Sequence, residues 1–184
     1  MTKTKSVPLS MLAAVAAAAL MVYGWFQLGP LVMMLFMATM AICIMDAFFG
    51  KVKLVMFIPC LFLPFISIIG SLVFAWVLCY TLVIWIFCGI INSSWLAKKL
   101  KLTGLEMATL QKYTTFGFGD VLGLPLVFAL AEIMFPHWGI PVMAAGLLAE
   151  SPLLIKRARK LQNIRMLAWL ALPIMAVFLV AVLT

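Results

Sequence analysis

Acidic residues, histidine and paired cysteines are all scarce in this chain of 184 residues. It has five acidic residues and a single histidine, His137, which stands alone in a predicted turn. The cysteines all lie within apolar runs, and no two of them have CxxC spacing: Cys43, Cys60, Cys79 and Cys88. Isolated cysteines in apolar surroundings are usually small buried hydrophobic residues. The sequence therefore predicts neither a disulfide framework nor a metal site.

Charged residues of either sign make up only 10% of the chain, whereas 67% of the residues are apolar. A soluble domain of this length does not need so much apolar surface. Apolar runs of about 18 residues or more are typical of transmembrane helices. The candidate spans are residues 8–26, 31–49, 54–69, 72–91, 121–135, 140–155 and 166–183, of which the third, fifth and sixth are short. The predicted fold is therefore an all-α, polytopic membrane bundle of about seven transmembrane helices.

The basic residues test this count of spans. If the spans alternate from a cytoplasmic N-terminus, all thirteen Lys and Arg fall on the cytoplasmic side, where such residues are enriched. The opposite side receives only short uncharged turns, at residues 27–30, 70–71 and 136–139. This predicts a multi-pass protein of the cytoplasmic membrane with its C-terminus outside. The net charge of +8 favours anionic lipids as partners. Nucleic acid is not an expected partner, because no basic groove is interleaved with aromatic residues.

We expect one membrane domain over residues 1–184, without an internal repeat or a disordered linker. Residues 1–27 are predicted to form an extra, uncleaved N-terminal helix, and residues 28–184 a six-helix core. Residues 92–115 are predicted to form a cytoplasmic loop with an amphipathic helix. Thr103 and Glu106 have the spacing of a capping box at the start of that helix. The helix lies either at the lipid interface or over a site, as a gate or substrate platform.

The only two aspartates lie at the same level of this topology. Asp46 comes five residues before Lys51, and Asp120 comes eight residues after Lys112. A carboxylate costs roughly 2.5–3.5 kcal/mol at the centre of a membrane helix, so acids in such segments point to function. If the spans of Asp46 and Asp120 pack side by side, their carboxyl groups meet and share one proton. Such a dyad can activate water to attack a peptide carbonyl without a metal or an organic cofactor.

The residues before Asp120 favour close approach of another backbone. Gly117 and Gly119 carry no side chains, so a substrate strand or a helix can lie against this segment. The sequence Gly117-Phe118-Gly119-Asp120 resembles the GxGD signature of intramembrane aspartyl proteases. Two spans separate the aspartate helices, an order that resembles the type IV prepilin peptidases and archaeal preflagellin peptidases more than the presenilin group. The resemblance covers about residues 28–184.

This resemblance implies an aspartic endopeptidase that cuts the leader of a membrane-inserted, pilin-like precursor near the cytoplasmic face. Asp46 and Asp120 would be catalytic, and Gly117, Phe118 and Gly119 would bind the substrate. The chain departs from the family after both aspartates, where the usual flanking residues are replaced. It also lacks the cysteine-rich methylation domain of the longer enzymes, so methyl transfer is not expected.

The same residues have structural explanations. Asp120 can cap the span that follows it, and Asp46 can pair with Lys51 or Lys53. Glu150 is expected to form an ion pair, and no role is assigned to Glu132. A stripe of methionines predicts packing or, alternatively, a surface that accommodates a substrate: Met33, Met34, Met37 and Met40. A transporter or a membrane assembly factor is therefore the alternative function, with the acids carrying protons or fixing helix packing.

Overall fold

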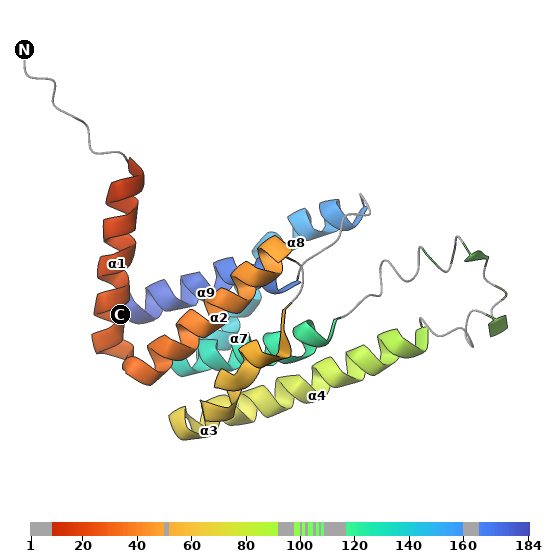
Figure 1. Ribbon diagram of the computed structural model, residues 1–184, viewed down its shortest axis with the longest axis horizontal. Coiled ribbons are helices and arrows are strands. Elements are labelled where there is room, and N and C mark those ends of the chain that lie inside the picture. Colours follow the sequence, from red (N-terminus) through yellow and green to blue (C-terminus); the bar gives the residue numbers. More distant parts are fainter. Residues whose placement is uncertain are drawn as a thin grey trace, which may run out of the picture.

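The computed structural model of the chain describes residues 9–49, 52–91, 98–99, 101, 103, 104, 106, 108, 117–159 and 166–184 (Figure 1). Regular structure in these residues is wholly helical, as the sequence predicts. The elements are α1 (Leu9–Leu28), α2 (Pro30–Phe49), the 3-10 helix η1 (Leu54–Phe62), α3 (Leu63–Ile66), α4 (Ile68–Ile91), α7 (Phe118–Met134), α8 (Gly139–Arg159) and α9 (Met166–Leu183). The predicted loop over residues 92–115 lies largely outside the described residues.

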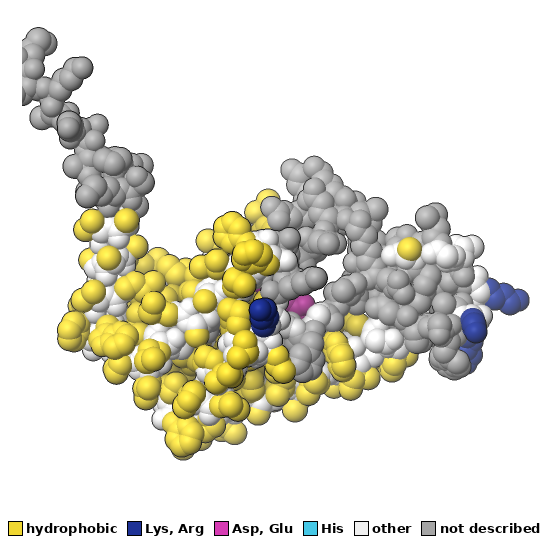
Figure 2. Space-filling view, in the orientation of Figure 1, with side chains coloured by type: hydrophobic (Ala, Val, Ile, Leu, Met, Phe, Trp, Pro, Cys, Tyr) yellow, Lys and Arg dark blue, Asp and Glu magenta, His cyan; other side chains and the backbone are white. Residues whose placement is uncertain are grey.

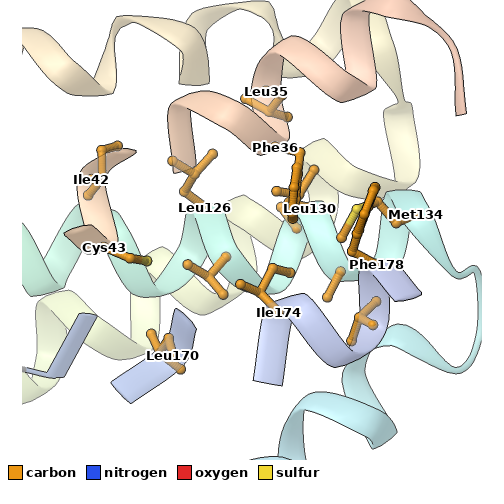
Figure 3. Close-up of a cluster of buried hydrophobic side chains, with 14 of the residues drawn as sticks. Leu35, Phe36, Ile42, Cys43, Leu126, Leu130, Met134, Leu170, Ile174 and Phe178 are labelled. Atoms are coloured by element: carbon orange, nitrogen blue, oxygen red, sulfur yellow. The ribbon is translucent and has the colours of Figure 1, made fainter. Parts of the chain in front are cut away.

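Helix α7 forms the centre of the bundle, with α2, α4, α8, α9 and η1 packed around it. Figure 3 shows the apolar side chains with which α2, α7 and α9 meet. The rings of Phe36 in α2 and Phe178 in α9 stack with their centroids 4.4 Å apart. Along α4, Gly70 allows close packing, because a Cβ there would lie 2.5 Å from the Ile133 side chain of α7. The two helices that carry Asp46 and Asp120, α2 and α7, therefore share one core.

Among the residues whose side chains the structure describes, two helices are long and apolar enough to cross a membrane by length and composition, within Pro30–Phe49 and Ile68–Ile90. Shorter apolar helices are Ala14–Leu28, Leu54–Ile66, Gly139–Leu153 and Leu167–Leu183. Helix α4 is covered on little of its surface and exposes large apolar side chains such as Trp76 and Phe87. Figure 2 shows apolar side chains over much of the described surface on this face. Apolar surface of this extent is typical of a protein in contact with lipid.

Helix α1 is set at a steep angle to α2 and α9 (Figure 1). It contacts these two helices, and its Gly24 packs against Phe178 and Met33. The chain turns at Gly29, whose φ of +83° is a backbone conformation favoured by glycine. A largely apolar groove of about 340 Å³ lies where α1 leaves α2, lined by Met21, Val22, Trp25, Phe26, Met33 and Met37.

The methionine stripe of α2 is divided between the core and the surface. Met33 is buried and Met40 packs against the core, which agrees with a packing role. Met34 and Met37 are exposed, so the alternative of a surface that contacts another molecule applies only to this half of the stripe.

The third predicted span differs from the expected helix over residues 54–69. It is a 3-10 helix, η1, followed by the single turn of α3. Pro59 lies inside η1, where it removes one backbone donor. The turn predicted at residues 70–71 is wrong, because the chain breaks at Ser67, whose backbone is extended. The Ser67 hydroxyl oxygen accepts a hydrogen bond from Gly70 N–H at 3.1 Å, which makes Ser67 the N-cap of α4.

Candidate functional site

Asp46 lies in the last turn of α2 and is buried, with 8% of its surface exposed. Its Oδ2 accepts a hydrogen bond from Ala168 N–H at 3.1 Å. Ala168 is in the first turn of α9, where backbone N–H groups lack partners within the helix. The positive end of the helix dipole also favours a carboxylate at this point. Asp46 thus joins the end of α2 to the beginning of α9.

Asp120 lies in the first turn of α7 and is half-buried. Its Oδ2 accepts a hydrogen bond from Gly117 N–H at 3.0 Å. This is the half of a capping box in which the side chain of the third helical residue bonds back to the N-cap residue. The opposite half requires a side-chain oxygen at the N-cap, and Gly117 has none. Asp120 thus helps to cap α7, but as the third residue of the helix; the N-cap position predicted for it is held by Gly117.

The beginning of α9 brings the two aspartates into one neighbourhood. Leu167, next to the bonding partner of Asp46, packs against Gly123, one turn after Asp120; a Cβ on Gly123 would collide with this leucine. Helices α2 and α7 are also in direct contact. In Figure 2 an acidic side chain is visible close to a basic side chain.

The glycines before Asp120 border this neighbourhood. A Cβ on Gly119 would meet only Val52, at an ordinary contact distance of 3.7 Å, so the segment leading into η1 lies beside the aspartates. A Cβ on Gly117 would lie 3.3 Å from Asp120 Oδ2. Gly117 is exposed, which leaves its backbone open to another chain. The side chain of Phe118, the third predicted substrate-binding residue, lies outside the described residues.

A residue that the sequence analysis did not single out, Thr81 of α4, also reaches this region. Its Oγ1 is 3.0 Å from the carbonyl oxygen of Val121 in α7, the residue that follows Asp120. Thr81 is 3% exposed on a helix whose surface is otherwise mostly uncovered. The sequence held one signal for such a contact: Pro125, four residues after Val121, cannot donate the usual helical hydrogen bond.

The other acidic residues have different surroundings. Glu132 accepts a hydrogen bond from His137 N–H at 2.7 Å and so stabilises the turn between α7 and α8. Glu150 is expected to form an ion pair, and the basic side chains that follow it, from Lys156 on, lie outside the described part of the structure. Among the described residues its buried Oε2 has no hydrogen-bond partner. Glu106 accepts hydrogen bonds at 2.8 Å from both the backbone N–H and the hydroxyl of Thr103, which confirms the predicted capping box. No group of three His, Cys, Asp or Glu side chains suited to a metal occurs within the described part of the chain.

No family model matches this chain, and searches of curated proteins and of solved structures found no match to it.

Proposed function

We propose that this protein is a membrane aspartyl endopeptidase that uses Asp46 and Asp120 as its catalytic dyad. One observation carries the proposal: Asp46 of α2 bonds to Ala168 at the start of α9, and the neighbouring Leu167 packs against Gly123, one turn after Asp120 in α7. In a catalytic dyad of two aspartates, one carboxyl group is ionised and the other is protonated. Placing two carboxylates in apolar surroundings costs free energy, which favours a functional reason for the presence of both acids.

The proposed reaction needs only the dyad and water. The ionised aspartate takes a proton from water, and the oxygen of that water attacks the peptide carbonyl carbon. The protonated aspartate donates a hydrogen bond to the carbonyl oxygen, and a proton then passes to the leaving amine as the C–N bond breaks. The dyad titrates as a unit, so the roles of acid and base belong to the pair.

The proposed substrate is a membrane-inserted precursor with a basic leader before an apolar helix, as in pilin-like proteins. The exposed backbone at Gly117 and the absence of side chains at Gly117 and Gly119 would let an unwound segment approach Asp120. We place the aspartates near the cytoplasmic face of the cell membrane, in a bundle of seven spans whose basic segments contact anionic lipids.

A second function is supported by the hydrogen bonds of the same two residues. Asp46 and Asp120 each accept a bond from a backbone N–H at the start of a helix. In a membrane assembly factor or a transporter, the two acids would serve to hold α2, α7 and α9 together or to carry protons. As an assembly factor, the protein would need only the capping bonds of the two acids; as a transporter, it would need their ability to release and accept a proton.

The substitutions Asp46→Asn and Asp120→Asn separate these functions, because asparagine keeps an oxygen that can accept the N–H bond but cannot act as an acid or a base. Each purified variant would be reconstituted in liposomes with a synthetic precursor that has a basic leader and an apolar helix. If the dyad is catalytic, each variant should lose cleavage by about 10²-fold or more while its thermal unfolding midpoint stays near that of the wild type.

Asp46→Ala and Asp120→Ala serve as matched variants that also remove the cap, and they should lower the unfolding midpoint. Cleavage at the wild-type rate by either asparagine variant would exclude the dyad. If the wild type does not cleave but drives proton flux that either asparagine variant abolishes, the transport function is favoured.

A further inference from the structure

The buried hydroxyl of Thr81 has two carbonyl oxygens within reach. Its Oγ1 lies 3.0 Å from Leu78 O in its own helix and 3.0 Å from Val121 O in α7. The first contact is the local bond that threonine makes in many helices. The second joins α4 to α7 at the residue next to Asp120. A hydroxyl has one proton, so the two carbonyl groups share it.

The carbonyl of Val121 needs this donor because of Pro125. In a regular helix the oxygen of residue 121 accepts the N–H of residue 125, but proline has no N–H and its ring displaces that carbonyl. Val121 is fully buried, so water does not replace the missing donor. A buried carbonyl group without a partner costs roughly 1–3 kcal/mol. The Thr81 hydroxyl therefore satisfies a group that the sequence of α7 leaves open.

Helix α8 meets the same need in a different way. Pro152 opens the carbonyl of Leu148, and the hydroxyl of Ser151 donates to that oxygen at 2.7 Å. Residues 118–124 of α7 contain neither serine nor threonine, so this helix has no local hydroxyl donor N-terminal to Pro125. The donor comes from α4 instead, which ties the first turn of α7 to a neighbouring helix.

We propose that Thr81 is a positioning residue for Asp120. By holding the Val121 carbonyl it fixes the first turn of α7 relative to α4, and this turn carries Asp120 toward Asp46. At the other end of the same helix pair, the close contact between Gly70 and Ile133 prevents α7 from sliding along α4. The effect of Thr81 on catalysis rests on the proposed function of the Asp46 and Asp120 dyad.

The first test measures precursor cleavage by Thr81→Val, which keeps the shape of the side chain and removes the hydroxyl. We expect kcat to fall by about tenfold or more with KM little changed, because small displacements of a catalytic group have effects of this size. Thr81→Ser should keep most of the activity. Thr39→Val is the matched control: Thr39 is equally buried, but its hydroxyl donates to Leu35 O within its own helix, so kcat should be unchanged.

A compensating substitution tests the hydrogen bond itself. Pro125→Ala restores an N–H for the Val121 carbonyl, so the double variant Thr81→Val/Pro125→Ala should recover most of the activity of Pro125→Ala alone. A role of Thr81 in packing alone would give no such recovery. Wild-type kcat in Thr81→Val, or a double variant as inactive as Thr81→Val, would overturn the proposal.

A measurement that does not depend on catalysis tests the positioning role of Thr81 separately from the protease function. Spin labels would be attached through Asp46→Cys and Asp120→Cys, in full-length chains with Cys43, Cys60, Cys79 and Cys88 replaced by alanine. The dipolar broadening between the labels should change when Thr81→Val is introduced. In the double variant Thr81→Val/Pro125→Ala it should return to the value of the labelled chain without these substitutions. If the wild type cleaves no precursor but this spectral pattern is found, the positioning role stands and the protease function fails. An unchanged spectrum in Thr81→Val would refute the positioning role whatever the activity.

Discussion

At the scale of single residues, Gly139 and Gly89 place the same residue type in opposite surroundings. A Cβ on Gly139 would collide with the backbone of Ala131 and Glu132, whereas a Cβ on Gly89 would meet nothing within 4 Å. Backbone atoms cannot move aside as the end of a side chain can. The turn between α7 and α8 is further held by the bond from His137 N–H to Glu132, which limits how far it can relax.

We therefore expect Gly139→Ala to lower the free energy of unfolding by about 2 kcal/mol or more. The matched variant Gly89→Ala should be neutral or stabilising by up to about 1 kcal/mol, because alanine is the better helix former. Thermal unfolding of both variants in the same detergent measures the difference. Equal midpoints for the two variants would contradict the close packing at Gly139.

Glu106 provides a residue-scale prediction about pH. Hydrogen bonds from the backbone N–H of Thr103, and then from its hydroxyl, lower the pKa of Glu106 below its ordinary value of 4.5. A carboxyl group with a lowered pKa stabilises the folded form above its unfolded pKa, and this contribution is lost as the pH falls through the folded pKa. The capped turn should therefore be intact at neutral pH and open in acid below pH 4.5.

An NMR titration of the Glu106 carboxyl carbon should give a midpoint below 4.5, and Thr103→Val should move that midpoint upward. The shift should be partial, because the backbone N–H of residue 103 remains. The same midpoint in both proteins would show that the Thr103 hydroxyl does not bond to Glu106 in solution.

At the scale of secondary-structure elements, Ser67 determines where α4 begins. Its hydroxyl oxygen accepts the bond from Gly70 N–H, whereas the hydroxyl of Ser71 donates to the Ser67 carbonyl, which already accepts Ser71 N–H. Removal of an N-cap costs about 0.5–2 kcal/mol. Ser67→Ala should therefore destabilise the protein by about that amount, and Ser71→Ala should have less effect. Denaturation of the two variants would test this, and a larger loss for Ser71→Ala would reject the assignment of the cap.

The positions of most helices could be predicted from the length of the apolar runs, because burial in lipid or protein requires long apolar segments. The boundary between η1, α3 and α4 could not. Apolar residues continue on both sides of Ser67, so hydropathy does not mark the break. Gly70 suggested a turn, yet it lies inside α4, where its lack of a side chain allows contact with Ile133. A glycine in an apolar run can form a turn or allow close contact between helices, and which of these occurs depends on the neighbouring helix.

The candidate site divides in the same way. Charge and topology predict that Asp46 and Asp120 lie at one level of the bundle, and the beginning of α9 contacts both Asp46 and the first turns of α7. Of their two backbone partners, Gly117 could be predicted from the sequence and Ala168 could not. Gly117 is three residues away, at a spacing typical of helix caps. Ala168 is distant in the sequence and has no side chain that marks a contact, so only the packing of α9 against α2 reveals it.

At the scale of the whole molecule, the question is whether α1 crosses the membrane, because α1 packs mainly against α2 and α9. It is a helix of 20 residues without a charged side chain, about 30 Å long, which matches the hydrocarbon thickness of a bilayer. Its surface is apolar on all sides, and such a helix is stable only inside lipid or protein. Much of its described part, residues 14–28, is exposed, and lipid is the covering that we expect.

We therefore expect α1 to cross the bilayer, with the turn at Gly29 outside and the first residues in the cytoplasm. Single cysteines introduced into the chain without its native cysteines would be labelled with a membrane-impermeant maleimide in intact cells or after lysis. Gln27→Cys and Trp138→Cys should react in intact cells, and Lys53→Cys and Lys99→Cys only after lysis. The decisive position is Lys3→Cys: it should react only after lysis if α1 crosses the bilayer. Reaction in intact cells would show that the chain crosses the membrane six times and that α1 lies along the outer face, as its steep angle to α2 in Figure 1 would also allow.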